Sequence, residues 1–184
     1  MVREAARGMV GGVAGSGAMV LAARLRRRRY ARRHGIAPAD IDEILDYDDS
    51  EHVVIAASTL LRHVIGWAPR SPRGCQALFW LVHWGYGSVV GAGHVALQHS
   101  PRRSRRSVEG STPTGELGRG GEPAADLAFF VGCQVMAFAL FPVLGDTPPP
   151  WRWGRRLLVT SLVQHAIYAG TVAATNTATA RWAR

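Results

Sequence analysis

Lysine is missing from this chain of 184 residues, in which all 22 basic residues are arginine. No electrostatic property of one protein requires that choice, so we interpret it as GC-rich coding bias, which suggests a high-GC bacterium. The net charge of +9 is one signature of nucleic-acid binding. The arginines stand in blocks beside apolar stretches, however, which is the usual topology signal of membrane proteins and a contact for anionic lipid headgroups. We therefore expect the lipid bilayer and its anionic headgroups as partners of these charges, and no nucleic acid.

Cysteine is scarce as well, because the chain contains only Cys75 and Cys133. Neither has metal-ligand spacing, and one pair in apolar surroundings does not make a disulfide framework. We expect both to be small packing residues. The recognisable enzyme motifs are missing too, among them the P-loop, Gly-x-Ser-x-Gly, His-Glu-x-x-His and Cys-x-x-Cys. The sequence therefore predicts no enzymatic activity, no metal and no cofactor.

Three long stretches lack Asp, Glu and Arg altogether: 75–97, 127–145 and 157–180. A helix rises about 1.5 Å per residue, so about 20 apolar residues cross a hydrocarbon core of about 30 Å. A fourth stretch, rich in Gly and Ala, is followed by a dense arginine block at 24–33, which is typical of a retained helix and not of a cleaved signal. The sequence predicts one all-α membrane domain over 1–184, a helical bundle with spans at about 8–25, 75–97, 124–145 and 157–180.

An amphipathic helix is predicted at 52–67, where the apolar residues share one face and the polar residues the other. It either lies in the membrane interface or crosses as a fifth span. If it crosses and the N-terminus is outside, the inner side carries 14 arginines and the outer side 7; if it does not cross, the best division is 13 against 9. The positive-inside rule then leans toward five spans. On that reading the Gly/Ser/Pro/Arg-rich segment 98–123 is a flexible cytoplasmic loop.

Two of the predicted spans share a motif. LVHWGYGSVVGAG at 81–93 and LVQHAIYAGTVAA at 162–174 both contain His-x-x-Tyr-small-x-x-x-small, which indicates an internal two-fold repeat. Small residues four apart form a stripe that lets two helices approach closely in lipid. The predicted packing residues are Gly8, Gly11, Gly12, Gly15, Gly87, Gly91, Ala169 and Ala173.

Polar side chains inside these spans are the candidates for function, because an unpaired polar group facing lipid is costly. They are His83, Tyr86, His94, Gln134, Gln164, His165 and Tyr168. One reading makes them hydrogen-bonding groups that hold the helices together, and another makes them a proton or solute pathway. Haem ligation by paired histidines would require two on the last span, which has only one.

The stretches GGVAGSGAMVLAAR, HWGYGSVVGAG and the degenerate QHAIYAG together resemble the YagU-like family of small bacterial inner-membrane proteins. That family has a Gly-rich first helix and later His-x-x-Tyr-Gly helices, whereas the second copy here has Ala169 in place of the glycine. The resemblance implies a membrane location and a repeat, and no catalytic role.

These observations favour a non-enzymatic structural or interaction protein of the bacterial cytoplasmic membrane, which self-associates or binds another membrane protein. The alternative is a small transporter or proton-conducting protein that uses the intramembrane His, Tyr and Gln residues.

Overall fold

The computed structural model describes residues 2–37, 41, 49–99, 123–144 and 148–182. Within them all regular secondary structure is helical, which confirms the predicted all-α class. The elements are α1 (Val2–His34), α2 (Asp49–Ile65), α3 (Pro72–Gln98), α5 (Pro123–Leu144), the short 3₁₀ helix η2 (Pro150–Arg152) and α6 (Arg155–Trp182).

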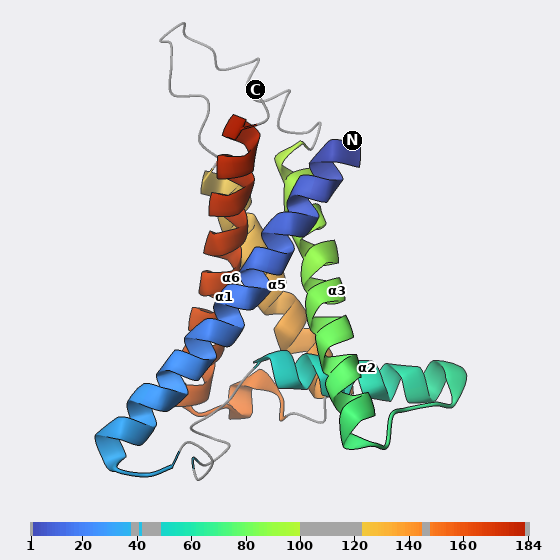
Figure 1. Ribbon diagram of the computed structural model, residues 1–184, viewed down its shortest axis with the longest axis vertical. Coiled ribbons are helices and arrows are strands. Elements are labelled where there is room, and N and C mark those ends of the chain that lie inside the picture. The colour runs from blue at the N-terminus through green and yellow to red at the C-terminus, as the bar shows by residue number, and fades with distance from the viewer. Residues whose placement is uncertain (1, 38–40, 42–48, 100–122, 145–147, 183–184) are drawn as a thin grey trace, which may run out of the picture.

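Four long helices form a bundle along the long axis of the molecule (Figure 1). Helices α1 and α5 run in one direction, and α3 and α6 run in the other, so that both chain termini lie at the same end. The start of α1 is tied to the end of α3 by an ion pair in which His99 Nε2 lies 3.2 Å from Glu4 Oε1.

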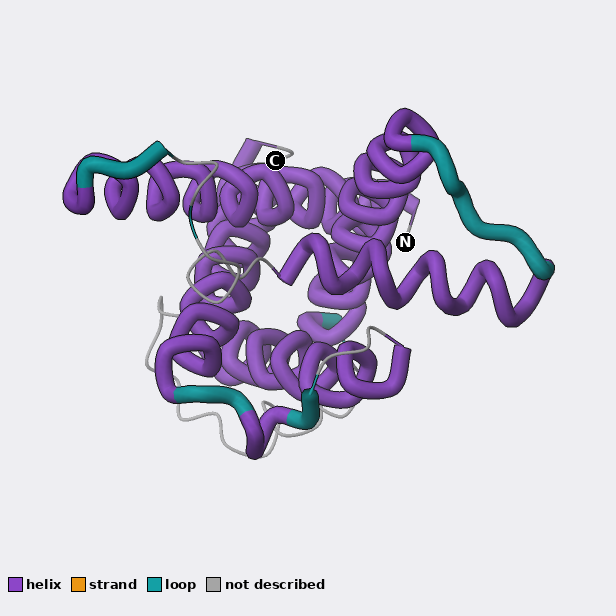
Figure 2. The backbone as a smooth tube through the Cα atoms, turned by 90° about the horizontal axis from the view of Figure 1, so that it is seen from below, coloured by secondary structure: helices purple, strands orange, loops and turns teal. Residues whose placement is uncertain are grey.

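Helix α2 does not run parallel to the four long helices. It lies across the end opposite to the termini, and part of it projects beyond the other helices (Figures 1 and 2). Ala56 is its buried contact with the bundle, whereas Leu60, Val64 and Ile65 on its predicted apolar face are exposed. Helix α2 therefore lies across the bundle and not along it.

The boundaries of these helices follow from local capping. The side chain of Ser71 accepts a hydrogen bond from the Gly74 amide at 3.1 Å, and Pro72 occupies the first position of α3. Helices α1 and α2 are each followed by a glycine with positive φ, Gly35 at 63° and Gly66 at 69°. Glycine adopts this conformation without the steric cost of a Cβ atom, which is why it so often follows a helix.

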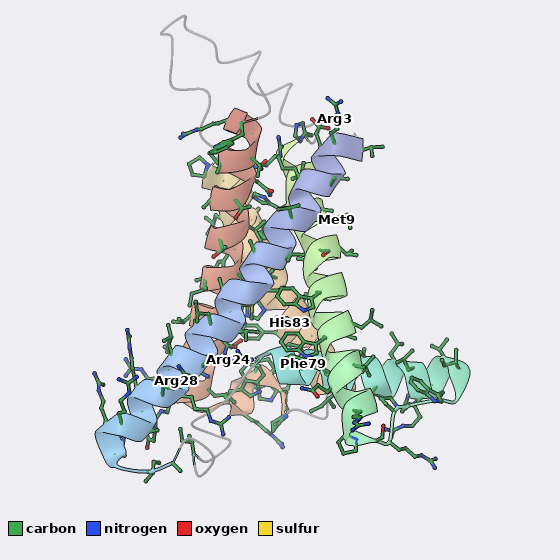
Figure 3. The ribbon with its side chains drawn as sticks, viewed as in Figure 1. Arg3, Met9, Arg24, Arg28, Phe79 and His83 are labelled. Atoms are coloured by element: carbon green, nitrogen blue, oxygen red, sulfur yellow. The ribbon has the colours of Figure 1, made fainter. Side chains whose placement is uncertain are left out.

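Helix α1 is longer than the predicted span. Its 33 residues continue through the arginine block without a break, giving a length of about 50 Å. Figure 3 shows Arg24 and Arg28 on the part of the helix that leaves the bundle. The arginines therefore extend the helix instead of following it.

Three helices, α1, α5 and α6, are long and apolar enough to cross a membrane. Of the four predicted spans, α3 alone does not reach the same mean hydropathy, although its 27 residues suffice in length. Its histidines, glycines and polar residues lower the average.

Polar side chains are buried inside the bundle beside its apolar core, and many large apolar side chains are exposed. Fully or nearly buried polar side chains belong to Ser16, His83, Ser88, His94, Gln134, Ser161, Gln164, His165 and Asn176. Exposed apolar side chains cover the outside of the same helices, among them Val13, Leu21, Leu81, Val89, Leu127, Val135 and Val163. Large exposed apolar side chains in this number are expected where lipid or a partner covers the surface.

The two cysteines differ in burial, and so do two of the tryptophans. Cys133 is buried in the core and fits the packing role, but Cys75 is exposed at the start of α3, so it is not a packing residue. Trp151 is 83% exposed, whereas Trp153 is buried against Ala137 and Phe141. Tryptophan is enriched at membrane interfaces; the exposed Trp151 suits such a position, whereas Trp153 belongs to the core.

Candidate functional site

The bundle is closest where α1 crosses α3. Gly12 and Gly87 face each other so tightly that a Cβ atom on Gly12 would collide with the carbonyl oxygen of Gly87. One turn further, a Cβ atom on Gly8 would lie 2.7 Å from the carbonyl oxygen of Gly91. These four predicted packing glycines therefore meet one another, backbone against backbone.

The crossing of α1 with α6 uses a different pattern. Gly15 lies against Tyr168 and Val172, and Gly11 lies against Asn176. Helix α6 thus presents the stripe Tyr168, Val172 and Asn176 to the glycines of α1. Ala169, which belongs to the small-residue stripe predicted on this helix, is buried in a core cluster with Phe129, Cys133 and Met19.

Polar contacts accompany the α1–α3 crossing. Ser16 Oγ donates to the carbonyl oxygen of His83 at 3.3 Å, and His83 Nε2 donates in return to the carbonyl oxygen of Ser16 at 3.2 Å. Figure 3 shows His83 in the middle of the bundle, where α1 passes α3. The phenol of Tyr168 donates to the carbonyl oxygen of Gly87 at 2.7 Å and so joins α6 to the same point.

A chain of three polar side chains links α5, α3 and α6 near the end that holds the termini. His94 Nε2 donates to Asp126 Oδ1 at 2.8 Å, and Asn176 Nδ2 donates to His94 Nδ1 at 2.9 Å. The side chain of His94 is 0% exposed and that of Asp126 33% exposed. Both imidazole nitrogens of His94 therefore have a hydrogen-bond partner, one on α5 and one on α6.

Asn176 makes this chain the meeting point of all four long helices. Its Oδ1 atom lies against Gly11 of α1, 2.7 Å from the position a Cβ atom would take there. That oxygen is buried and has no hydrogen-bond partner.

A second polar group lies between α5 and α6. Gln134 Nε2 donates to Ser161 Oγ at 3.2 Å, and His165 Nδ1 donates to the carbonyl oxygen of Ser161 at 3.0 Å. Gln164, also predicted, is 1% exposed. The structure therefore places both candidate glutamines inside the bundle.

The two sequence motifs converge on one internal cavity of about 70 Å³. All five α-helices contribute to its wall, including Ala56 of α2, and most of the lining is apolar. Its polar lining groups come from Ser16, His83, Tyr86, Cys133, His165 and Tyr168. Tyr86, predicted as an internal polar group, lines this cavity but is also 37% exposed.

Asp126 and Asn176 are not among the site residues predicted from the sequence. Asp126 stands in the first turn of α5, where an acidic residue also suits the helix dipole. Asn176 follows His165 by eleven residues, as His94 follows His83. Extending the motif comparison past its second small residue would have aligned His94 with Asn176, the pair that the structure joins.

The described part of the chain contains no cluster of three or more His, Cys, Asp and Glu side chains able to hold a metal ion. Comparisons of the chain with protein-family models, curated proteins and solved structures found no match. The resemblance to YagU-like proteins therefore stays a prediction.

Proposed function

We propose that the protein is a multi-pass integral membrane protein in which α1, α3, α5 and α6 cross the bilayer and α2 lies in one interface. Two observations carry this proposal: α1, α5 and α6 are long and apolar enough to cross a membrane, and polar side chains are buried in the bundle while large apolar ones are exposed. Helix α3 fits it despite its lower hydropathy, because its polar residues His83, Ser88 and His94 are turned inward. Its outward residues Leu81 and Val89 are 71% and 70% exposed.

Arginine counting then suggests the orientation. With four crossing helices, the sequence segments on the side of α2 and the arginine block contain 13 arginines, and the segments on the other side contain 9. The positive-inside rule favours the α2 end as cytoplasmic. The segment between α3 and α5 then belongs to the outer side, opposite to the expectation from five spans; its residues 100–122 lie outside the described part.

The activity that the geometry supports best is that of a non-enzymatic structural or interaction protein of the bacterial cytoplasmic membrane. The supporting observation is how the intramembrane polar groups are used: His83, His94 and Tyr168 each bind a neighbouring helix. Such bonds between helices stabilise membrane bundles by about 1 kcal/mol each. The exposed apolar faces then remain for lipid, a second copy or another membrane protein.

The arrangement of the helices is also compatible with the predicted repeat. The pairs α1–α3 and α5–α6 run in the same alternating directions (Figure 1), as in membrane proteins with parallel repeats. His94 and Asn176, at matching positions of the two motifs, bind each other. We propose that the two pairs are related halves whose contacts with the rest of the bundle have since diverged.

Reporter fusions test this membrane arrangement. A cytoplasm-specific reporter fused after Arg33 should be active, and a reporter that works only outside the membrane should be active after Arg106. The physical reason is that α1 and α3 each cross once while α2 does not. Activity of the same reporter at both positions would contradict the proposal.

A second candidate function, transport or proton conduction, is favoured by the convergence of both motifs on one cavity. Its volume of about 70 Å³ exceeds the 10–15 Å³ or so that one water needs. Two of its lining residues, His83 and His165, are histidines, a side chain that often serves as a proton shuttle. Intramembrane ionisable groups often line such routes.

Proton flux into vesicles that contain the purified protein tests this candidate. If the cavity conducts, His83→Ala and His165→Ala should each lower the flux to that of empty vesicles, because each removes one of its titratable groups. His63→Ala is the matched control, since His63 is exposed on α2 and bonds only to the carbonyl oxygen of Thr59 in its own helix. Flux that is absent, or equal in all three variants, would exclude conduction through this cavity.

A further inference from the structure

Outside the bundle core, a hollow lies between the arginine-bearing end of α1 and the beginning of α6. Its volume is about 670 Å³, within the range of sites that hold drug-sized ligands. The residues that line it and matter here are Leu25, Arg29, Tyr30, Arg33, His34 and Arg156. Five of these are on α1, and Arg156 faces them from the first turn of α6.

Contacts of the Tyr30 ring join the two helices that form this hollow. The guanidinium carbon of Arg156 lies 5.7 Å from the centre of the Tyr30 ring, a cation–π contact that joins α6 to α1. The rings of Tyr30 and His34 are stacked with their centres 4.0 Å apart. Arg29, Arg33 and Arg156 are exposed, so their guanidinium groups can reach a ligand from two helices.

The lining changes character along α1. Ala22 and Leu25 form its apolar part next to the predicted span, and the arginines follow toward the end of the helix. From Ala22 to Arg33 the helix advances about 16 Å. An amphiphile with an anionic head and an apolar tail matches this order, whereas a small free anion would use only the arginine part.

We propose that this hollow binds the phosphate-bearing headgroup of an anionic phospholipid, with its acyl chains along Ala22 and Leu25. Arginine forms paired hydrogen bonds to phosphate oxygens, which makes it the preferred side chain for such groups. Basic pockets between helices on the cytoplasmic side of membranes bind headgroups of this kind. The proposal rests on the membrane arrangement proposed above, because that arrangement puts the hollow at the cytoplasmic interface.

The test measures how much phosphatidylglycerol, cardiolipin or phosphatidylcholine the purified full-length protein retains in detergent. Each arginine near an anionic surface contributes about fivefold in affinity, the equivalent of about 1 kcal/mol. The double variant Arg29→Gln and Arg33→Gln should therefore retain the anionic lipids about 25-fold more weakly. Phosphatidylcholine should be retained weakly by all variants.

The matched control is the double variant Arg28→Gln and Arg32→Gln, which removes the same charge at the same spacing. Those two arginines line a different hollow on the other side of α1. A second comparison sets Arg156→Gln against Arg155→Gln, because Arg155 does not line the proposed site. If the double variants do not fold, this comparison of single variants is enough to test the proposal. Equal losses in site and control variants would overturn the proposal.

Competition by inorganic phosphate and glycerol phosphate distinguishes a lipid headgroup from a free phosphate as the ligand of this hollow. We expect neither to displace bound lipid at millimolar concentration, since neither contacts the apolar part of the hollow. Displacement by free phosphate as effective as by lipid would overturn the lipid assignment. If the membrane proposal itself is wrong, the result differs from loss of the lipid site: the wild-type protein is then recovered without detergent and outside the membrane fraction.

Discussion

Replacing Gly87 with leucine should abolish the folded bundle. A Cβ atom there would collide with Ser16 Oγ and lie 3.2 Å from the carbonyl oxygen of Gly12. Overpacking a well-packed core costs about 1 to 3 kcal/mol, and we expect at least the upper value because a backbone atom of α1 cannot turn away. Thermal unfolding and size-exclusion chromatography in detergent should show a large loss of folded protein.

The matched control is Gly85→Leu on the same helix, where an added Cβ atom meets nothing within 4 Å. It should leave the melting temperature nearly unchanged. Two smaller variants give a finer test: Gly87→Ala alone should destabilise the bundle, and adding Ser16→Gly should restore part of the loss. Equal stability of the Gly85 and Gly87 variants would show that α1 and α3 do not cross at this glycine.

Replacing Asp126 with leucine should destabilise the bundle by about 1 to 3 kcal/mol, because the Nε2–H group of a fully buried His94 then loses its acceptor. Asp126→Asn should cost much less, since the amide oxygen can accept the same hydrogen bond. Chemical or thermal unfolding in detergent measures both variants. Asn176→Leu should also be costly, for the added reason that its side chain lies against Gly11.

A double-mutant cycle separates this hydrogen bond from general damage to α5. In a His94→Phe background the N–H group is gone, so Asp126→Leu should cost little more than the loss of an exposed charge. Coupling energies between polar groups in membrane bundles average about 0.6 kcal/mol and reach about 1.7 kcal/mol. An unchanged cost of Asp126→Leu in that background would contradict the contact.

The sequence carries much of the helical architecture because apolar length and small-residue spacing are local properties. Gly8, Gly12, Gly87 and Gly91 could be identified from spacing alone, and the structure pairs them. The partners of buried polar groups are not local. His94 was recognised as polar and internal, but its acceptor comes from another helix 32 residues away, and no periodicity within α3 encodes that distance.

The motif on α6 shows that the spacing of small residues does not determine which face of a helix packs against a given neighbour. Its small residues suggested the same use as in α3, yet α6 turns Tyr168, Val172 and Asn176 toward α1. Helix rotation about its own axis depends on all the neighbours that pack around it, so one stripe cannot fix it. The position of α2 was open for a similar reason, because an amphipathic pattern suits both an interface and a crossing.

The number of crossing helices is tested most directly by the sidedness of the residues that flank α2. Ala37 precedes α2 and Cys75 follows it, so a membrane-impermeant thiol reagent can compare native Cys75 with an Ala37→Cys variant that carries Cys75→Ser. A Thr112→Cys variant, also with Cys75→Ser, marks the segment between α3 and α5. We predict that positions 37 and 75 react only in inside-out vesicles, and position 112 only from the outside of intact spheroplasts. Labelling of positions 37 and 75 from opposite sides would show that α2 crosses the membrane and would contradict the four-helix account.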